Sequence, residues 1–250
     1  MTVIAEIGEN AAKIKAIQQH CPAIDVIGVN SYGGAFSLAE RYKASGVTKP
    51  YVVTEFGPIG PWEGGHTSYG APIEPTSTDK VAMYDRAYAN AVNAAPGTSL
   101  GGYAFLWGWK QETTATWFGL MLEDGTLTPA VNAVARAWGG KTVPMPTLSA
   151  IKLNGPDTAA PGGVIRASVD AKGETKIEWQ LHRETQQPGV GGSFEPKTRQ
   201  FPDALKPAGD SVTVTLPAEP GVYRLYAFAR DNAGHAATSN VPLRVRKKTD

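Results

Sequence analysis

The feature that most constrains the fold of this chain is a change of hydrophobic period near residues 143–147. Before this point, short apolar runs alternate with stretches whose apolar residues recur at helical spacing. After it, helical spacing disappears, and segments that alternate apolar and polar residues are separated by Gly, Pro and Asp. The pattern therefore predicts two domains, one that mixes strands with helices and one built of strands alone.

Four apolar runs in the first part have the length and composition of buried strands. They cover residues 2–5, 23–32, 52–55 and 102–107. Helical patterns lie between them, and this alternation is typical of a parallel sheet with helices packed outside it. We therefore expect four β/α units within a domain at residues 1–142.

The second part, residues 147–250, predicts a β-sandwich. Its alternating runs are spaced by turns as the strands of sandwiches are. Trp179 lies at the centre of one such run, so we expect it in the core. Tyr223 follows Pro220 and Gly221 near the start of a strand, which resembles the tyrosine corner of immunoglobulin-like sandwiches.

Charge and cysteine content exclude several classes of protein. The chain has 24 basic and 23 acidic residues, which gives no field for holding nucleic acid or an anionic membrane. The single cysteine, Cys21, rules out an internal disulfide framework, and its setting predicts a buried thiol. No apolar run approaches the roughly 20 residues of a membrane span. Localisation stays open, and a periplasmic or extracellular site would require an export signal upstream of Met1.

The sequence indicates neither a metal site nor a cofactor site. His20, His182 and His235 lack metal-ligand partners at a suitable spacing. The glycines do not form a phosphate-binding pattern, so no nucleotide is implied.

Polar and aromatic residues gather at the ends of three consecutive predicted strands. They are Asn30, Tyr32, Glu55, Trp107 and Trp109. Because parallel strands end at one edge of a sheet, we expect these side chains to share a rim. Amide, phenol and carboxylate groups can hold sugar hydroxyls, and an indole can pack on the apolar face of a pyranose.

The strings DVIGVNSYGG, KPYVVTEFGP and GGYAFLWGWK, with the later WFGLMLEDGTLTPAV, resemble the last strands of a (β/α)8 barrel. The barrel is that of retaining β-glycosidases of glycoside hydrolase clan A, of the β-glucanase and β-galactosidase type. The resemblance covers about residues 2–140 and implies the C-terminal half of such a TIM barrel, strands five to eight. The expected fold class is therefore α/β plus all-β, a half-barrel followed by an immunoglobulin-like sandwich.

The resemblance also implies roles for individual residues. Glu55 matches the carboxylate nucleophile, Tyr32 the tyrosine that donates a hydrogen bond to it, and Trp107 the indole beneath the cleaved sugar. Asn30 and Trp109 join them as expected substrate-binding residues. We expect the Tyr32 hydroxyl to lie within hydrogen-bond reach of Glu55.

The second carboxyl group of retaining chemistry is missing from the pattern. Such enzymes need an acid/base about 5 Å from the nucleophile, and in this family it follows an Asn. The chain contains no Asn-Glu pair. Glu6, Glu63, Glu74 and Glu112 are candidate replacements, although carboxylates in loops are usually solvated. His66 could contact substrate, but a single histidine in a loop is more often simply exposed.

Two functions follow from these observations. The first is the C-terminal portion of a retaining β-glycosidase that acts on a β-linked glycan and is inactive alone. The second is a non-catalytic fragment that binds a glycan or has a structural, oligomerising role. The open edges of four strands predict a partner, either a second copy in a homodimer or a separate N-terminal barrel half. These motifs do not indicate which sugar or linkage is recognised, or whether the reaction would be hydrolysis or transglycosylation.

Overall fold

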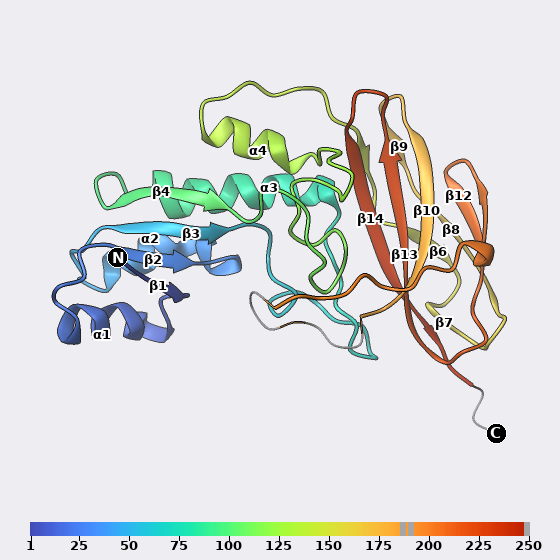
Figure 1. Cartoon of the computed structure of the whole chain (residues 1–250), viewed down its shortest axis with the longest axis horizontal. Coiled ribbons are helices and arrows are strands. Elements are labelled where there is room, and N and C mark those ends of the chain that lie inside the picture. The colour runs from blue at the N-terminus through green and yellow to red at the C-terminus, as the bar shows by residue number, and fades with distance from the viewer. Residues whose placement is uncertain (186–188, 190–192, 248–250) are drawn as a thin grey trace.

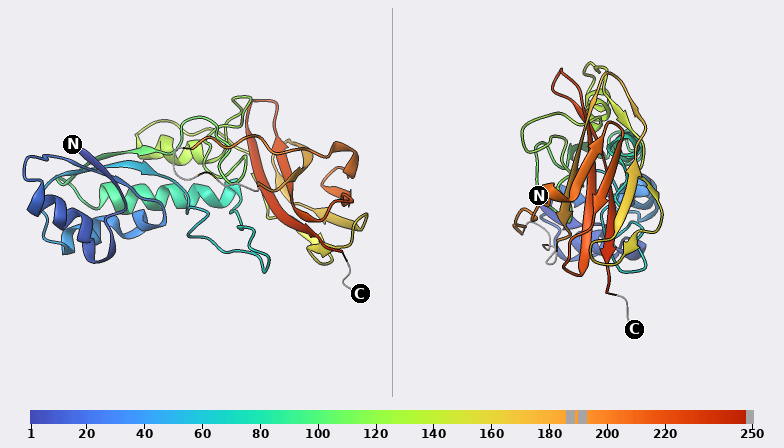
Figure 2. Two further views of the ribbon diagram at one scale, coloured as in Figure 1. Left: turned by 60° about the horizontal axis from the view of Figure 1, so that its bottom comes forward. Right: turned by 90° about the vertical axis from the view of Figure 1, so that its right-hand side faces the viewer.

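The structure is a computed structural model that describes residues 1–185, 189 and 193–247. The molecule is elongated, with its N-terminus in one part and its C-terminus at the far end of the other (Figures 1 and 2). Within the described residues, fourteen strands form four sheets. The four α-helices of this part of the chain are 7 to 12 residues long.

The N-terminal part holds one small parallel sheet, with strand order β1-β2-β3-β4. Its elements are β1 (Thr2–Ala5), α1 (Ala12–His20), β2 (Ile27–Asn30), α2 (Leu38–Ala44), β3 (Tyr51–Phe56), α3 (Ser77–Tyr88), β4 (Ser99–Ala104) and α4 (Ala130–Ala137). Short 3-10 turns precede α1 and α2 at Glu9–Ala11 and Gly33–Ser37, and a π-helical turn, Ala89–Asn93, extends α3.

The two faces of this sheet differ. One face packs against the helices and carries buried residues such as Val29, Val53 and Phe56. On the other face the centre of β2 is glycine, because a Cβ at Gly28 would lie 2.8 Å from the Val3 side chain. The Val3 side chain itself is 50% exposed. The sheet therefore has a single apolar core, on its helical side.

The C-terminal part is a β-sandwich. Its strands are β5 (Thr147–Leu148), β6 (Lys152–Asn154), β7 (Thr158–Ala159), β8 (Val164–Ser168), β9 (Ala171–Lys172), β10 (Lys176–Arg183), β11 (Leu205–Ala208), β12 (Ser211–Thr215), β13 (Gly221–Arg230) and β14 (Ala236–Val245), with a 3-10 turn at Pro202–Ala204. The two larger sheets have the orders β10-β13-β14-β7 and β11-β12-β8-β6. Strands β5 and β9 pair separately.

One apolar core fills the space between the two larger sheets. It contains Val214 from one sheet and Leu225 from the other, together with Trp179, whose predicted core position is confirmed. The Tyr223 hydroxyl donates a hydrogen bond of 2.7 Å to the Glu219 carbonyl, four residues upstream. This is the bond expected of a tyrosine corner.

Buried polar groups join the two parts. Arg224 of β13 donates two hydrogen bonds to the Glu184 carboxylate, at 2.6 and 2.7 Å, and a third to the Pro72 carbonyl. Glu74 pairs with Lys80 of α3 and also accepts a hydrogen bond from Asn240 of β14. The start of α3 therefore docks on the sandwich, as Figure 1 shows.

The predicted fold class, a TIM half-barrel followed by an immunoglobulin-like sandwich, is wrong. The described residues form a mainly β structure with few, short helices, and the N-terminal strands make a small open sheet. Beyond β4, residues 105–129 contain no α-helix and only isolated bridges. Hydrophobic period reports whether a segment is strand or helix, whereas barrel curvature depends on strand tilt and stagger between segments. The assignment of residues 1–142 to half of a barrel is therefore also wrong. The domain boundary at residues 143–146 stays a prediction.

The prediction of a buried thiol at Cys21 is also wrong, because this cysteine is exposed. It lies just after the end of α1, where the chain turns toward Pro22. Helical spacing of apolar residues predicts burial only for residues inside the helix. Cys21 lies one residue beyond it, so this spacing does not predict whether Cys21 is buried.

Candidate functional site

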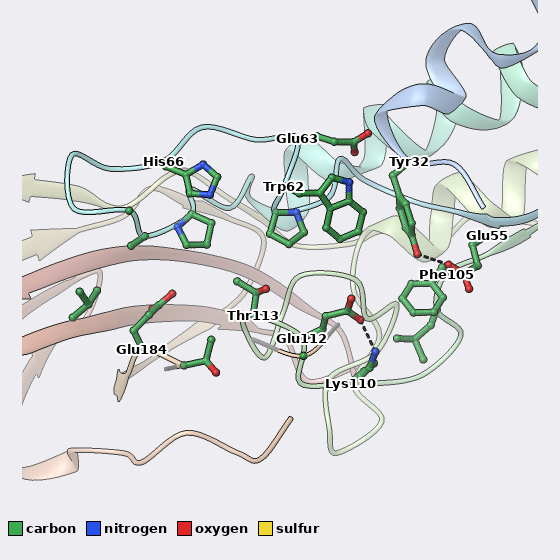
Figure 3. Close-up of a pocket in the computed structure, with 18 of the residues that line it drawn as sticks. Tyr32, Glu55, Trp62, Glu63, His66, Phe105, Lys110, Glu112, Thr113 and Glu184 are labelled. Carbon is green, nitrogen blue, oxygen red and sulfur yellow. Dashed lines mark hydrogen bonds and ion pairs between the residues drawn. The ribbon is translucent and has the colours of Figure 1, made fainter. Parts of the chain in front are cut away.

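Tyr32 and Glu55 meet at the carboxyl ends of β2 and β3. The Tyr32 hydroxyl donates a hydrogen bond of 2.7 Å to Glu55 Oε2, so the predicted contact is confirmed (Figure 3). Burial raises the pKa of Tyr32, and the hydrogen bond to Glu55 raises it further. The phenol therefore stays protonated and serves as a donor to the carboxylate.

Aromatic packing holds the Tyr32 ring in place. Its centroid lies 5.1 Å from that of Phe118, 5.5 Å from that of Trp62 and 6.0 Å from that of Phe105. Trp62 can approach because residue 60 is glycine, where a Cβ would lie 2.5 Å from the indole. The direction of the Tyr32 hydroxyl is thus fixed by rings from three separate segments of the chain.

A cavity of about 1150 Å³ opens beside this pair. The sheet contributes Asn30, Tyr32 and Glu55, and the loop after β3 contributes Trp62, Glu63 and His66. The segment after β4 contributes Phe105, Lys110 and Glu112, and the sandwich contributes Glu184 and Val222. Figure 3 shows the labelled members of this set, among them Glu55, Trp62 and Glu184, around one space between the two parts of the molecule.

The other carboxylates that line this cavity are held by charged groups or backbone N–H groups. Glu6 pairs with Arg41 at 2.8 Å, and Glu63 accepts from the Gly33 and Gly60 N–H groups at 2.9 and 2.8 Å. Glu112 pairs with Lys110 at 2.6 Å.

Glu184 is bound by Arg224, and burial nevertheless raises the pKa of Glu184. Glu55 differs from all of these carboxylates. Its hydrogen bond comes from a neutral hydroxyl, and within the described residues it takes part in no ion pair. Glu55 is thus the cavity carboxylate whose charge is least neutralised by its surroundings.

The other predicted site residues do not all line the Glu55 cavity. Asn30 lines the Glu55 cavity, and its side-chain oxygen accepts a hydrogen bond of 2.6 Å from Thr54. Trp107 does not line it in the described part of the molecule, and its side chain is 59% exposed. Strand β4 ends at Ala104, so Trp107 falls in the turns that follow rather than at a strand end. Trp109 lines a second, smaller cavity, and its indole N–H donates to the Ala115 carbonyl at 2.8 Å.

The candidate replacement acids also lie in different environments. Glu6, Glu63 and Glu112 line the Glu55 cavity, as does His66. Glu74 does not share this location, because it is buried at the junction beside Lys80, Thr114 and Thr116. Burial alone would raise its pKa, but Lys80 and the hydroxyl donors outweigh that effect and lower it.

Sequence reasoning missed several residues of the cavity. Trp62 lies seven residues after Glu55 in a Gly- and Pro-rich loop. A loop that begins beside Glu55 can bring this side chain back toward the strand end, so the sequence did carry a signal for Trp62. Glu184 and Val222 had no such signal, because they belong to the sandwich and reach the cavity only through the packing of the two parts.

Two searches of the described residues gave negative results. No cluster of three or more His, Cys, Asp or Glu side chains could hold a metal ion there. None of the helices in that part of the chain has the length and apolar character to cross a bilayer.

No protein family model matches this chain, and no curated protein matches it. Among solved structures, the PKD domain of an M14-like peptidase from a Thermoplasmatales archaeon has a TM-score of 0.25 and 13% identity, and covers 39% of this chain and 94% of its own. The superoxide reductase (neelaredoxin) of Ignicoccus hospitalis has a TM-score of 0.23 and 17% identity, covering 41% of this chain and 82% of its own.

A third structure extends along the whole chain. The glycosyl hydrolase family 2 member from Bacteroides cellulosilyticus has a TM-score of 0.29 and 12% identity, covering 100% of this chain and 28% of its own. It is thus a weak structural neighbour. Likeness at these scores and identities does not show a family.

Proposed function

We propose that the cavity beside Glu55 binds a carbohydrate and that Glu55 acts as the nucleophile of a retaining glycoside hydrolase. The observation that carries this proposal is the 2.7 Å hydrogen bond from Tyr32 to Glu55 at the mouth of a large cavity. A carboxylate that attacks a sugar must be ionised and must keep an oxygen available. A neutral donor on Oε2 leaves Oε1 available for attack, whereas a bound cation would reduce nucleophilicity.

The cavity wall has the chemistry that a sugar needs. Trp62 and Phe105 provide apolar ring surface beside the catalytic carboxylate, and Asn30 and His66 provide polar groups. Sugars bind to such surfaces through C–H faces stacked on rings and hydroxyls held by polar side chains. The volume of about 1150 Å³ is large enough for more than one sugar unit.

The second carboxyl group of a retaining site limits the expected activity. Retaining chemistry requires a proton donor about 5 Å from the nucleophile. The carboxylates Glu6, Glu63 and Glu112 near Glu55 are each engaged by a cation or by backbone N–H groups. We therefore expect attack by Glu55 to proceed on glycosides with very good leaving groups and turnover of ordinary glycosides to be slow or absent.

This expectation defines the experiment. The purified chain is incubated with dinitrophenyl 2-deoxy-2-fluoro-β-glycosides of several hexoses, whose leaving group departs without protonation. Glu55 then forms a bond to the anomeric carbon as dinitrophenolate leaves, and intact-mass and peptide mass spectrometry locate the adduct. We expect one adduct per chain, on Glu55.

Two variants test the assignment. Glu55→Gln should abolish labelling, and Glu40→Gln, a change at an exposed glutamate of α2, should leave it unchanged. Tyr32→Phe should slow labelling about tenfold or more, because a hydrogen bond to a charged group contributes about 1.5–3 kcal/mol. Absence of any adduct, or an adduct that survives Glu55→Gln, would remove Glu55 from a catalytic role.

The engagement of the other carboxylates favours a second candidate function, non-catalytic glycan binding. In that case no adduct forms, but β-linked oligosaccharides bind in calorimetry and Trp62→Ala weakens the binding. Glu55→Gln would then change affinity only slightly. Loss of both labelling and binding would reject the two candidates together.

A further inference from the structure

The Glu55 cavity extends well beyond the carboxylate from which it takes its name. Figure 3 shows Glu55 at one end of the space and Glu184 of the sandwich at the other, with Trp62, Glu112 and Thr113 between them. Attack by Glu55 involves a single sugar ring, which would occupy only the end of the cavity next to the parallel sheet. Most of the cavity therefore lies on the sandwich side of the ring that Glu55 would attack.

The size of the cavity indicates how many sugar units it can hold. Its volume is about 1150 Å³, whereas pockets for drug-sized ligands have volumes of roughly 300 to 1,000 Å³. A trisaccharide has the mass of a drug-sized ligand, so about three sugar units fit between the parallel sheet and the sandwich. A monosaccharide would leave most of this space to water.

Trp62 offers an open ring surface between the two ends of the cavity. Its ring packs on that of Tyr32 in a T-shaped contact, with 5.5 Å between the centroids, and the residue is nevertheless 62% exposed. The contact with Tyr32 thus fixes the indole without covering it. An indole that is held in place and still exposed is suited to stacking on the apolar face of a pyranose.

The start of β13 forms part of the far end of the cavity. The Val222 carbonyl accepts a hydrogen bond of 3.0 Å from the Glu184 N–H, so these two residues lie side by side, and both line the cavity. Arg224 lies two residues further along β13, on the same face of the strand, and donates a hydrogen bond of 2.9 Å to the Pro72 carbonyl. Val222 therefore faces the N-terminal part and presents an apolar side chain to the cavity.

The charged side chains that line the cavity toward the sandwich are paired with opposite charges. The pairs are Lys110 with Glu112, Arg224 with Glu184 and Arg183 with Glu219, at 2.6, 2.6 and 3.3 Å. An ionic ligand would have to compete with these pairs, whereas a neutral sugar leaves all of them intact. This part of the cavity therefore favours a neutral sugar chain.

We propose that the Glu55 cavity holds a neutral oligosaccharide of about three units, with one unit at Glu55, the next against Trp62 and the most distant beside Val222 of the sandwich. The sandwich is then part of the substrate site and sets the preferred chain length. This inference rests on the proposed function in one respect, the identification of the cavity as a carbohydrate site. It does not require Glu55 to react.

Calorimetry with oligosaccharides of increasing length tests the proposal on the unaltered chain. The probes are methyl β-glucoside, methyl β-mannoside, and the cello-, laminari- and β-manno-oligosaccharides up to the pentasaccharide. In at least one series we expect the affinity to rise at least tenfold from the monosaccharide to the trisaccharide and to change little beyond it, because the cavity is then full. Absence of binding in every series, or binding that gains nothing beyond one unit, would overturn the proposal.

Variants at the sandwich end locate the distal unit. Val222→Trp places an indole where that unit would lie, so the trisaccharide should bind at least tenfold more weakly. The matched control is Val164→Trp, at a 60% exposed valine of β8 in the other large sheet, which should leave the affinity unchanged. Circular dichroism and urea unfolding establish that both variants are folded. Trisaccharide affinity that Val222→Trp leaves unaltered would place the chain elsewhere and refute the proposal.

The result can be told apart from that of the labelling experiment on Glu55. An adduct on Glu55 together with binding that does not depend on chain length would refute the three-unit site and leave the nucleophile in place. Affinity that rises with chain length in the absence of any adduct would support the three-unit site and favour non-catalytic glycan binding.

Discussion

The parallel sheet and the sandwich differ in how the two faces of their sheets are covered. The two larger sheets of the sandwich cover each other, and one core receives side chains from both. The parallel sheet is covered by helices on one face only, and Val3 and Tyr103 are 50% and 67% exposed. The sandwich therefore encloses its core between two sheets, whereas the N-terminal part leaves one face of its sheet open.

The difference also bears on function. Apart from residues 184–204, which join β10 to β11, the sandwich uses short connections between its strands, whereas β3 and β4 of the parallel sheet are both followed by long segments that enclose the Glu55 cavity. Sandwich residues such as Glu184 close its far side. The parallel sheet thus positions the reactive carboxylate, and the sandwich supports the loops around it.

The largest expected effect comes from breaking the buried Arg224–Glu184 pair of the sandwich, beside its junction with the N-terminal part. Arg224→Met leaves Glu184 buried without its cation, and removing one partner of a buried pair costs about 3–5 kcal/mol. Urea unfolding followed by tryptophan fluorescence and by circular dichroism measures the loss. Arg136→Met, at an exposed pair with Asp85, should cost less than about 1 kcal/mol. A loss as small at Arg224 would show that this buried pair contributes little to the stability of the sandwich.

The next effect is a pH dependence located in the sandwich. Burial lowers the pKa of His182 to about 4, and the unfolded value is 6.5. Between these values the unfolded chain binds more protons, so stability falls as pH falls, by up to about 3 kcal/mol at the acid end. Urea midpoints measured from pH 7 to pH 4 should fall less in His182→Gln than in the parent. The exposed His20→Gln should keep the parental slope, and equal slopes in all three proteins would contradict the assignment.

A smaller effect is expected at the start of α3, the helix that docks on the sandwich. The Thr76 hydroxyl accepts a hydrogen bond from the Asp79 N–H at 3.1 Å, and the Asp79 carboxylate accepts from the Thr76 N–H. Removing such a cap costs about 1 kcal/mol. Thr76→Ala should lower the unfolding free energy by that amount, and Thr76→Ser should restore most of it. A failure of serine to restore stability would point to packing rather than capping.

The smallest effect is expected on the open face of the parallel sheet. Tyr103→Ser should change the unfolding free energy by no more than about 0.5 kcal/mol, because an exposed side chain loses little contact on truncation. Sedimentation of the parent and the variant at several concentrations should be run beside the unfolding measurement. A larger loss that grows with protein concentration would mean that a second copy covers this face.

Several local features were predictable from the sequence. The contact between Tyr32 and Glu55 follows from their places at the ends of neighbouring parallel strands, and Trp179 was recognisable from its centre position in an alternating run. Trp107 was misplaced relative to the cavity because β4 ends at Ala104, three residues earlier than expected. The exact end of a strand depends on pairing with its neighbour, and hydrophobic pattern does not report it.

The sequence by itself determined which segments are strands, where the apolar period changes and which carboxylate ends the central strand, because these depend on side chains close together in the chain. Tertiary structure alone decided that the N-terminal strands form a small open sheet in a mainly β molecule. It alone decided that Glu184 and Val222 reach the Glu55 cavity. Curvature, closure and cavities arise where distant segments pack together, and no local pattern encodes that packing.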